Sequence, residues 1–250
     1  MKDKIDWSSV DKATRDAARS ILTEIALDPY MGLSEQMHAI RWWHSIEIPG
    51  LGITPGTEPN SRSRDAYLNI PWSDIAGKRV LDIGAWDGLY SFLAEDAGAN
   101  HVVAMDLWRD EGSSSIQGVR PSRVGFDFAH EARGSKRVFG QQGSVYDLDY
   151  GKWEFVFFFG VLYHLEDPMR AFRAIHRAMA PGGLLIVESD TEPGGACVMR
   201  FAEHGHNGDE TNVWYPTVPC VEAMMRKAGF ETTLQAGGIG TRRAWHGVRQ

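Results

Sequence analysis

KRVLDIGAWDGLYSFLAEDAGANHVVAMD, residues 78–106, is the stretch from which the fold of this chain can be predicted. A short apolar run at 80–83, interrupted only by an aspartate, and a second run at 102–104 have the composition of strands buried on both faces. Between them, apolar residues recur at helical spacing over 89–97, and Gly98 is a typical helix stop. The stretch therefore predicts a strand, a glycine-bearing turn, a helix and a second strand.

The turn after the first of these strands is bracketed by Gly84 and Gly88. In a parallel βαβ unit, the carboxyl end of the first strand is where nucleoside-containing ligands bind. Asp106 ends the second strand, where a carboxylate can accept both hydrogen bonds of a ribose diol. We therefore expect a nucleoside site between the turn and Asp106.

The residues of the turn distinguish between kinds of nucleoside cofactor. A dinucleotide loop reads G-x-G-x-x-G, but Trp86 stands here where a phosphate loop needs a small residue. Asp82 would repel a diphosphate and suits a cation. S-adenosylmethionine carries a sulfonium, an ammonium and a ribose but no phosphate. The run resembles the first motif of the class I S-adenosylmethionine-dependent methyltransferases, with tryptophan replacing the usual middle glycine; a generic βαβ unit with a tight turn is the alternative.

Length and composition set bounds on the rest. The 250 residues allow one large domain, or one domain with an appendage, and 43% of them are apolar. A formal net charge of −7 argues against a surface built mainly for nucleic acid phosphates, although a local basic patch stays open. Cys197 and Cys220 predict two reduced thiols rather than a disulfide framework or a zinc site. The polar start at 1–20 has no signal-peptide core, and no run is apolar enough to span a membrane, so we expect a cytoplasmic protein.

Strands alternate with helices along the chain, which predicts an α/β fold. We expect a doubly wound, mostly parallel sheet of the Rossmann-like methyltransferase type, with an antiparallel edge at the end. Residues 1–64 are predicted to form an N-terminal helical lid and a connecting loop, and residues 65–250 the domain that binds the cofactor. The expected lid helices cover 8–27 and 34–43, the second capped by Ser34, and the loop covers 45–64, with a short edge strand at 46–48. A glycine- and serine-rich connection up to residue 122 is expected to be mobile. After it, helices are expected at 123–128, 169–180 and 219–229, and strands at 136–141, 153–159, 183–188, 231–235 and 243–248.

The methyltransferase resemblance implies a set of cofactor contacts. Gly84, Ala85 and Gly88 would let the amino-acid end of S-adenosylmethionine approach the backbone, and Asp82 would face its ammonium group. Asp106 and Leu107 would hold the ribose and flank the adenine. The remaining predicted cofactor contacts are Ser144 and Val145 at the adenine, Phe159 and Gly160 beside the methionine part, and Arg64 at its carboxylate. An ordinary strand-to-helix loop is the alternative for Ser144 and Val145.

The residues after Gly160 would lie at the opening where the methyl group is transferred. The displacement at a sulfonium is already activated, so positioning accounts for most of the catalysis. An oxygen or nitrogen acceptor still has a proton to lose, and His164, Tyr163 and His44 are the candidates for general base. A packing role at the pocket wall is the alternative for His164. His44 ranks lower because it belongs to the expected lid.

A narrower resemblance rests on four motifs in the same order: TPG at 54–56, LDIGAWDG at 81–88, VLYHLEDP at 161–168 and NVWYP at 212–216. Together they resemble the tRNA wobble-uridine carboxymethyltransferase family and its small-molecule-methylating relatives, over residues 42–248. The carboxymethyl-transferring members carry lysines and tryptophans that hold an extra carboxylate on the donor, and the corresponding stretch here is SRSRDAYLNIPW at 61–72. We therefore expect plain methyl transfer to an oxygen or nitrogen of a small molecule, for example a natural product.

Several alternatives remain open at this point. A tRNA wobble uridine is the second choice of acceptor, and salt-sensitive tRNA binding would favour it. A protein that binds S-adenosylmethionine without transferring its methyl group is the third, and a nicotinamide dehydrogenase the fourth. Residues 204–210 contain metal-like ligands but are read as a flexible loop, and no metal is expected; Arg170, Arg173 and Arg177 are read as a solvated helix face. No membrane partner is expected, and a homodimer is left open.

Overall fold

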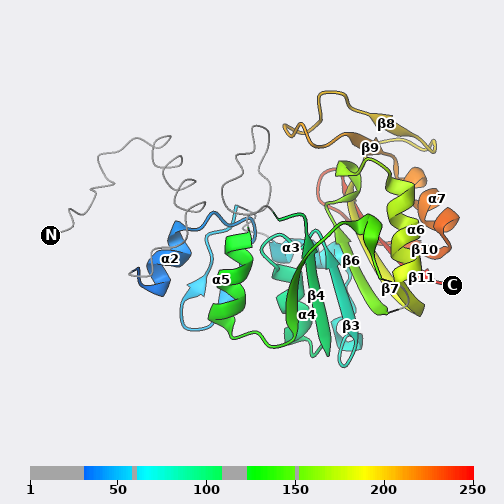
Figure 1. Ribbon diagram of the computed structural model, residues 1–250. Helices are drawn as coiled ribbons and strands as arrows, with labels where there is room; N and C mark the ends of the chain where they lie inside the picture. The colour runs from blue at the N-terminus through cyan, green and yellow to red at the C-terminus, as the bar shows by residue number, and fades with distance from the viewer. Residues whose placement is uncertain (1–30, 58–60, 109–122, 150–151) are drawn as a thin grey trace.

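A computed structural model describes residues 31–57, 61–108, 123–149 and 152–250. It has a central sheet with helices on both faces, as Figure 1 shows. The predicted helix at 8–27 and most of the connection that was expected to be mobile lie outside the described residues.

The central sheet has seven strands in the order β10-β11-β7-β6-β3-β4-β5. Their bounds are β3 (Arg79–Ile83), β4 (His101–Asp106), β5 (Val138–Gln142), β6 (Trp153–Phe159), β7 (Met179–Asp190), β10 (Phe230–Leu234) and β11 (Arg242–Arg249). The first five are parallel, whereas β11 pairs antiparallel with both β7 and β10. The predicted doubly wound sheet with an antiparallel edge is thus confirmed. The chain changes winding direction between β3 and β6, and such a switch point opens a crevice at the carboxyl ends of the strands.

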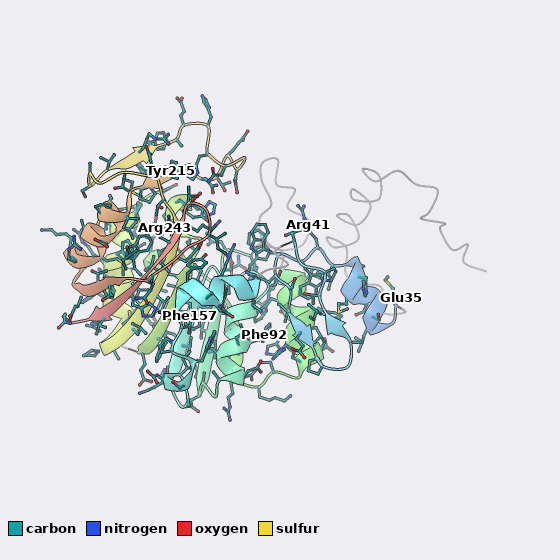
Figure 2. The ribbon with its side chains drawn as sticks, turned by 180° about the vertical axis from the view of Figure 1, so that it is seen from behind. Glu35, Arg41, Phe92, Phe157, Tyr215 and Arg243 are labelled. Atoms are coloured by element: carbon teal, nitrogen blue, oxygen red, sulfur yellow. The ribbon has the colours of Figure 1, made fainter. Side chains whose placement is uncertain are left out.

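Alternate residues of the strands face two separate cores. Leu81 and Ile83 of β3 pack with α6 (Pro168–Ala178) and α7 (Val218–Ala228). Val80 faces the other way, toward α4 (Leu89–Asp96), α5 (Arg123–Arg133) and the segment that precedes the sheet. Phe92 of α4 and Phe157 of β6, both labelled in Figure 2, belong to this second core. The strands carry apolar residues in consecutive positions because both faces of the sheet are covered.

The segment before the sheet differs from its prediction. Helix α2 (Leu33–Ala39) ends earlier than the expected residue 43, and Ser34 lies inside it rather than capping it. The first turn is closed instead by Glu35, which accepts a hydrogen bond from the Gly32 N–H at 3.2 Å. Ile40 is already extended and buried, so packing overrides helix propensity at this end.

The expected loop at 45–64 also contains regular structure. β1 (Glu47–Ile48) and β2 (Gly52–Ile53) form a hairpin of their own, so β1 is not an edge of the main sheet. Helix α3 (Ser61–Leu68) begins inside the expected loop, which means that the predicted boundary after residue 64 falls within a helix. A short 3-10 helix, η2 (Trp72–Asp74), follows. Tyr67 and Leu68 are buried and His246 of β11 bonds to the Leu68 carbonyl at 2.8 Å, so tertiary contacts fix α3.

β8 (Met199–Phe201) and β9 (Trp214–Pro216) were not predicted. They pair antiparallel in a separate sheet, and residues 199–216 are called the arm below. Figure 1 shows the arm at the top, apart from the main sheet, and Figure 2 labels Tyr215 on it. Within the described part of the chain, no helix is both long and apolar enough to cross a membrane.

Candidate active site

The glycine turn is built on unusual backbone angles. Gly84 has a φ of +78°, and its N–H donates to the Met105 carbonyl at 2.8 Å, which ties the end of β3 to β4. A β-carbon at Gly84 would lie 2.3 Å from Cγ2 of Val161. The turn therefore needs glycine both for its φ and for the close approach of the residues after β6.

Trp86 occupies the position that the sequence marked as unusual. Its φ is +50°, a left-handed conformation that is uncommon for a bulky residue. Its backbone N–H donates to Oδ2 of Asp106 at 2.8 Å, and its carbonyl accepts from the Trp108 indole at 2.9 Å. Its ring stacks on Trp43, with 5.0 Å between centroids. Asp106 and two tryptophans thus stabilise the strained turn.

Two carboxylates flank the turn, as predicted. Asp82 is 3% exposed and accepts a hydrogen bond from the Ser91 hydroxyl at 2.7 Å. Burial raises the pKa of Asp82 to about 7, against the hydrogen bond from Ser91, and the charge of Asp106 adds to the rise. Burial likewise raises the pKa of Asp106 to about 6, although Asp106 accepts from the N–H groups of Trp86 and Leu107. Two buried acids that ionise reluctantly suit a cationic ligand, because a nearby positive charge would favour their ionised forms.

Asp87 is a residue that the sequence reasoning missed. It is 1% exposed, and its Oδ2 accepts from the backbone N–H groups of Trp43 at 2.7 Å and His44 at 2.9 Å. Burial raises its pKa to about 7. A β-carbon at Gly125 would come within 2.8 Å of its carboxylate. Asp87 therefore fastens the segment before the sheet to the glycine turn, and the only sequence signal for it is an acidic residue inside the motif.

The other predicted adenine and ribose contacts gather at the same edge. Gly143, after β5, donates its N–H to the Asp106 carbonyl at 3.1 Å. Ser144 caps the 3-10 helix η3 (Val145–Asp147) by accepting from the Tyr146 N–H, and Val145 is buried. Leu107 is 56% exposed next to Asp106. The structure thus brings these residues beside Asp106.

A buried ion pair lies on the other side of β6. Arg242 of β11 donates to both oxygens of Glu188 at 2.9 and 3.0 Å, and to the hydroxyl of Tyr163 at 3.0 Å. Glu188 is fully buried at the end of β7 and also accepts from the Tyr67 hydroxyl at 3.1 Å. Gly160, with a φ of +69°, donates its N–H to the Glu188 carbonyl. Sequence reasoning identified Gly160 and Tyr163 but not Glu188 or Tyr67, because nothing local marks a long-range pair.

The histidine and the arginine from the predicted lid and its connecting loop are both buried. His44 is 6% exposed and Arg64 is 8% exposed. Burial and, to a smaller extent, the positive charge of Arg64 lower the pKa of His44 to about 3. The Arg64 charge also acts on the hydroxyls of Tyr67 and Tyr163. Phe159 packs edge-on against Tyr90 with 4.8 Å between ring centroids. Residues far apart in sequence thus meet in one polar cluster.

His164 lies at the end of the short 3-10 helix η4 (Leu162–His164), on the exposed side of the chain. Its Nδ1 is 3.0 Å from the carbonyl and 3.0 Å from the hydroxyl of Thr211, on the arm. Although the residue is exposed, its ring packs against Tyr163 at 4.5 Å between centroids, and this partial loss of solvent lowers its pKa; the hydrogen bond to Thr211 and the charge of Asp209 act in the opposite direction. Of the three predicted bases, His164 is therefore the one whose ring is held by hydrogen bonds to Thr211 of the arm.

The metal-like ligands at 204–210 and the arginines of α6 make the following contacts. Among the described residues, no group of three or more His, Cys, Asp or Glu side chains is arranged to hold a metal ion. His206 is instead bonded through Nε2 to the Trp214 carbonyl at 2.9 Å. The arginines of α6 are exposed, and Arg170 lies over the Tyr146 ring. Both cysteines are free thiols. A cavity of about 620 Å³ lies beside α4, but the residues of the glycine turn do not line it.

Solved structures of S-adenosylmethionine-dependent methyltransferases share this fold. One from Mesorhizobium loti matches with a TM-score of 0.55 at 17% identity, over 72% of this chain and 94% of its own. The N-terminal domain of EvdMO1, solved in the presence of SAH and D-fucose, matches with a TM-score of 0.59 at 18% identity, over 87% and 94% of the two chains. These likenesses define the class of fold as that of the S-adenosylmethionine-dependent methyltransferases.

Sequence comparison gives the family. A family model described as "Methyltransferase domain" matches residues 60–235. The tRNA U34 carboxymethyltransferase of Pseudomonas syringae is 30% identical over 231 residues, covering 91% of this chain and 65% of the relative. That of Stutzerimonas stutzeri is 29% identical over 232 residues, covering 88% and 61%. The chain thus spans less than two thirds of these curated relatives. It belongs to the methyltransferase family, and its fold is that of the class I enzymes that use S-adenosylmethionine.

The two acids beside the glycine turn fit this cofactor. Asp82 and Asp106 are buried with raised pKa values, so a positively charged ligand would favour their ionised forms, whereas the space beside Gly84 is filled by Val161 of the chain itself. S-adenosylmethionine supplies a methyl group on a sulfonium that is already activated for displacement. The residues of the chain therefore have to bind the cofactor, orient the acceptor and take up the proton that the acceptor loses.

Proposed function

We propose that this enzyme transfers a methyl group to an oxygen or nitrogen of a small molecule. The observation that carries the proposal is the pairing of Arg242, which donates to both oxygens of Glu188 and to Tyr163. Because Glu188 already neutralises its charge, Arg242 does not offer an unpaired cation for an extra carboxylate on the donor. Plain S-adenosylmethionine, which has no such carboxylate at the transferred carbon, suits a balanced pocket of this kind.

The proposed cofactor contacts begin with the two acids beside the glycine turn. Asp106 would accept from the ribose diol, and Asp82 would compensate the ammonium charge, directly or through water. The full set of proposed cofactor contacts is Arg64, Asp82, Gly84, Ala85, Gly88, Asp106, Leu107, Ser144, Val145, Phe159 and Gly160. Arg64, which is buried beside His44, would serve the methionine carboxylate.

His164 is the proposed general base. A pKa of about 3 makes His44 a weak proton acceptor at neutral pH. Burial raises the pKa of Tyr163 to about 12, so this hydroxyl stays protonated and can donate a hydrogen bond to the acceptor. The pKa of His164 is also lowered, so its imidazole is neutral near pH 7 and has a lone pair that can accept a proton.

Carboxymethyl transfer to tRNA is the second candidate. Its support is the Tyr163 hydroxyl, which lies 3.2 Å from the position of a Gly160 β-carbon and is bonded to Arg242. A donor carboxylate that displaced Glu188 could use both groups. The relatives at 29–30% identity are tRNA U34 carboxymethyltransferases, although this chain covers only part of their length. A binding protein without transfer is the remaining alternative.

The test uses the full chain with methyl-labelled S-adenosylmethionine, bulk tRNA and a small-molecule extract of the source organism. We expect label in the small-molecule fraction and release of S-adenosylhomocysteine, with no label in RNA. Carboxymethyl groups in tRNA after incubation with the carboxylated donor would favour the second candidate. Cofactor binding by calorimetry without release of S-adenosylhomocysteine from either pool would favour the binding protein. A cytoplasmic location and the homodimer remain predictions.

A further inference from the structure

The arm forms hydrogen bonds to three successive residues after β6, which are residues 163–165. The Val213 N–H donates to the Tyr163 carbonyl at 3.0 Å. The Trp214 indole donates to the Leu165 carbonyl at 2.8 Å. Between these two bonds, Nδ1 of His164 meets Thr211. The proposed base is therefore held by a segment that lies nearly fifty residues further along the chain, and its ring is fixed from one side.

The partners of His164 determine which ring nitrogen carries the proton. A backbone carbonyl can only accept, so Nδ1, at 3.0 Å from the Thr211 carbonyl, has to be the donor. The Thr211 hydroxyl gives the same result, because it donates to Oδ1 of Asp209 at 2.7 Å and thus presents its lone pairs to Nδ1 at 3.0 Å. Nε2 of His164 keeps its lone pair as a consequence.

Asp209 is the charged end of this chain of hydrogen bonds. Its Oδ1 also accepts from the Thr211 N–H at 2.8 Å, so it fixes both the backbone and the hydroxyl of Thr211. The charged or titratable groups that act on His164 are Asp209, which raises its pKa, and Arg242 and His206, which lower it; the Tyr163 ring packs at 4.5 Å between centroids. Asp209 is the one acid among them, and it therefore favours a proton on His164.

We infer that Asp209 and Thr211 are positioning residues for methyl transfer, which hold His164 as the Nδ1–H tautomer with Nε2 as the proton acceptor. This inference rests on the proposed role of His164. The acceptor oxygen or nitrogen forms a bond to the methyl carbon while the carbon–sulfur bond breaks with its electron pair on sulfur. The proton of the acceptor passes to Nε2, and the imidazolium that forms is stabilised by Asp209 through Thr211.

The alternative is that these hydrogen bonds only fasten the arm to the sheet. The two roles separate in a measurement that does not need the acceptor: ¹⁵N-histidine NMR of the full chain over a pH titration, with His164→Gln for assignment. Asp209→Asn and Thr211→Val test the relay. Arg200→Gln is the matched control, because Arg200 lies on the same arm and pairs with Glu192 rather than with His164.

In the wild type we expect His164 to be protonated at Nδ1 and unprotonated at Nε2. Asp209→Asn should lower the pKa of His164 by roughly half a unit to one unit, the size of one lost charge at short range in partly screened surroundings. Arg200→Gln should leave that pKa unchanged. With an acceptor in hand, Asp209→Asn should reduce kcat by about tenfold or more and shift the acidic limb of the pH–rate profile the same way, with KM for S-adenosylmethionine unchanged.

A His164 ring protonated at Nε2 would overturn the inference. The inference would also fail if Asp209→Asn left the pKa of His164 unchanged and lost as much unfolding free energy as Arg200→Gln. In that case the hydrogen bonds of the arm would serve only to hold it to the sheet. If the tautomer and pKa shift are found but His164→Gln keeps full methyl transfer, the base assignment fails and the inference fails with it. The class I assignment and the small-molecule proposal would survive that result.

Discussion

The two halves of the active site are built in different ways. The glycine turn with its flanking acids, residues 78–106, is the contiguous part of the proposed cofactor site and is called the cofactor half here; its key hydrogen bond from Trp86 to Asp106 joins residues only 20 positions apart. The cluster around the Glu188–Arg242 pair, called the acceptor half because its Tyr163 is proposed to donate to the acceptor, is assembled from distant segments: Tyr163 and Arg242 are 79 positions apart, and Tyr67 and Glu188 are 121 apart. A motif in the sequence can encode the first kind of site, whereas only folding creates the second.

The contrast extends to charge. The cofactor half gathers acids with raised pKa values around one turn, so a bound cation would favour their ionised forms. The acceptor half pairs its charges internally, because Glu188 and Arg242 neutralise each other. Binding of a cationic ligand should therefore change the protonation of the acids in the cofactor half. Loss of one partner of the Glu188–Arg242 pair should instead lower the free energy of unfolding.

The largest expected effect is on the acceptor half. Arg242→Met removes the partner of a fully buried carboxylate, which leaves Glu188 with an uncompensated charge. Since the Arg242 side chain is 28% exposed, we expect a loss at the low end for buried pairs, about 3 kcal/mol of unfolding free energy by urea denaturation. Arg243→Met is the control, because within the described part of the chain the hydrogen bonds of Arg243 go to the backbone carbonyls of Gly240 and Arg242 rather than to a carboxylate. Equal stability of the two variants would refute the distinction between the halves.

The next effect concerns the cofactor half. Asp106→Ala removes the proposed ribose acceptor and leaves the N–H groups of Trp86 and Leu107 without their carboxylate. We expect S-adenosylhomocysteine to bind roughly 10- to 150-fold more weakly by calorimetry, from about 1.5–3 kcal/mol of charge-assisted hydrogen bonding. Asp127→Ala, in an exposed ion pair on α5, should bind it normally. Unchanged affinity in Asp106→Ala would remove this residue from the site.

A third prediction uses the raised pKa values of about 7 at Asp82 and about 6 at Asp106. In the free protein these acids stabilise the fold below pH 4, and that contribution is lost as the pH rises through their folded pKa values. A bound cation favours the ionised forms, so cofactor binding should release protons between pH 6 and 7. S-adenosylmethionine should bind about tenfold more weakly at pH 6 than at pH 8.

Calorimetry in two buffers of different ionisation enthalpy would detect these protons. Asp82→Asn should reduce the pH dependence, since it removes the group with the higher pKa of the two. If the wild type bound S-adenosylmethionine with the same affinity at pH 6 and pH 8, ionisation of these acids would not be coupled to binding of the cofactor.

The smallest effect is at Trp86. Trp86→Gly relieves a left-handed backbone, worth about 1 kcal/mol, but loses the stacking on Trp43, worth about 0.5–1.5 kcal/mol. The two terms nearly cancel, so we expect a net change within about 1 kcal/mol by circular dichroism in urea. Trp86→Ala keeps the strain and loses the stacking, and should be the less stable variant. The reverse order would show that backbone strain at the turn is absent.

The sequence by itself determined the βαβ unit, the class of cofactor and the order of strands and helices, because glycine angles, hydrophobic periodicity and the acid at the end of a strand are local properties. It failed at the cap and the end of α2, at the start of α3 and at the arm, where packing against distant segments decides the conformation. The partners of His164 and Arg242 were decided only by the tertiary structure. A hydrogen bond between residues 47 or 54 positions apart leaves no periodic trace in the chain, since either partner alone looks like an ordinary polar residue.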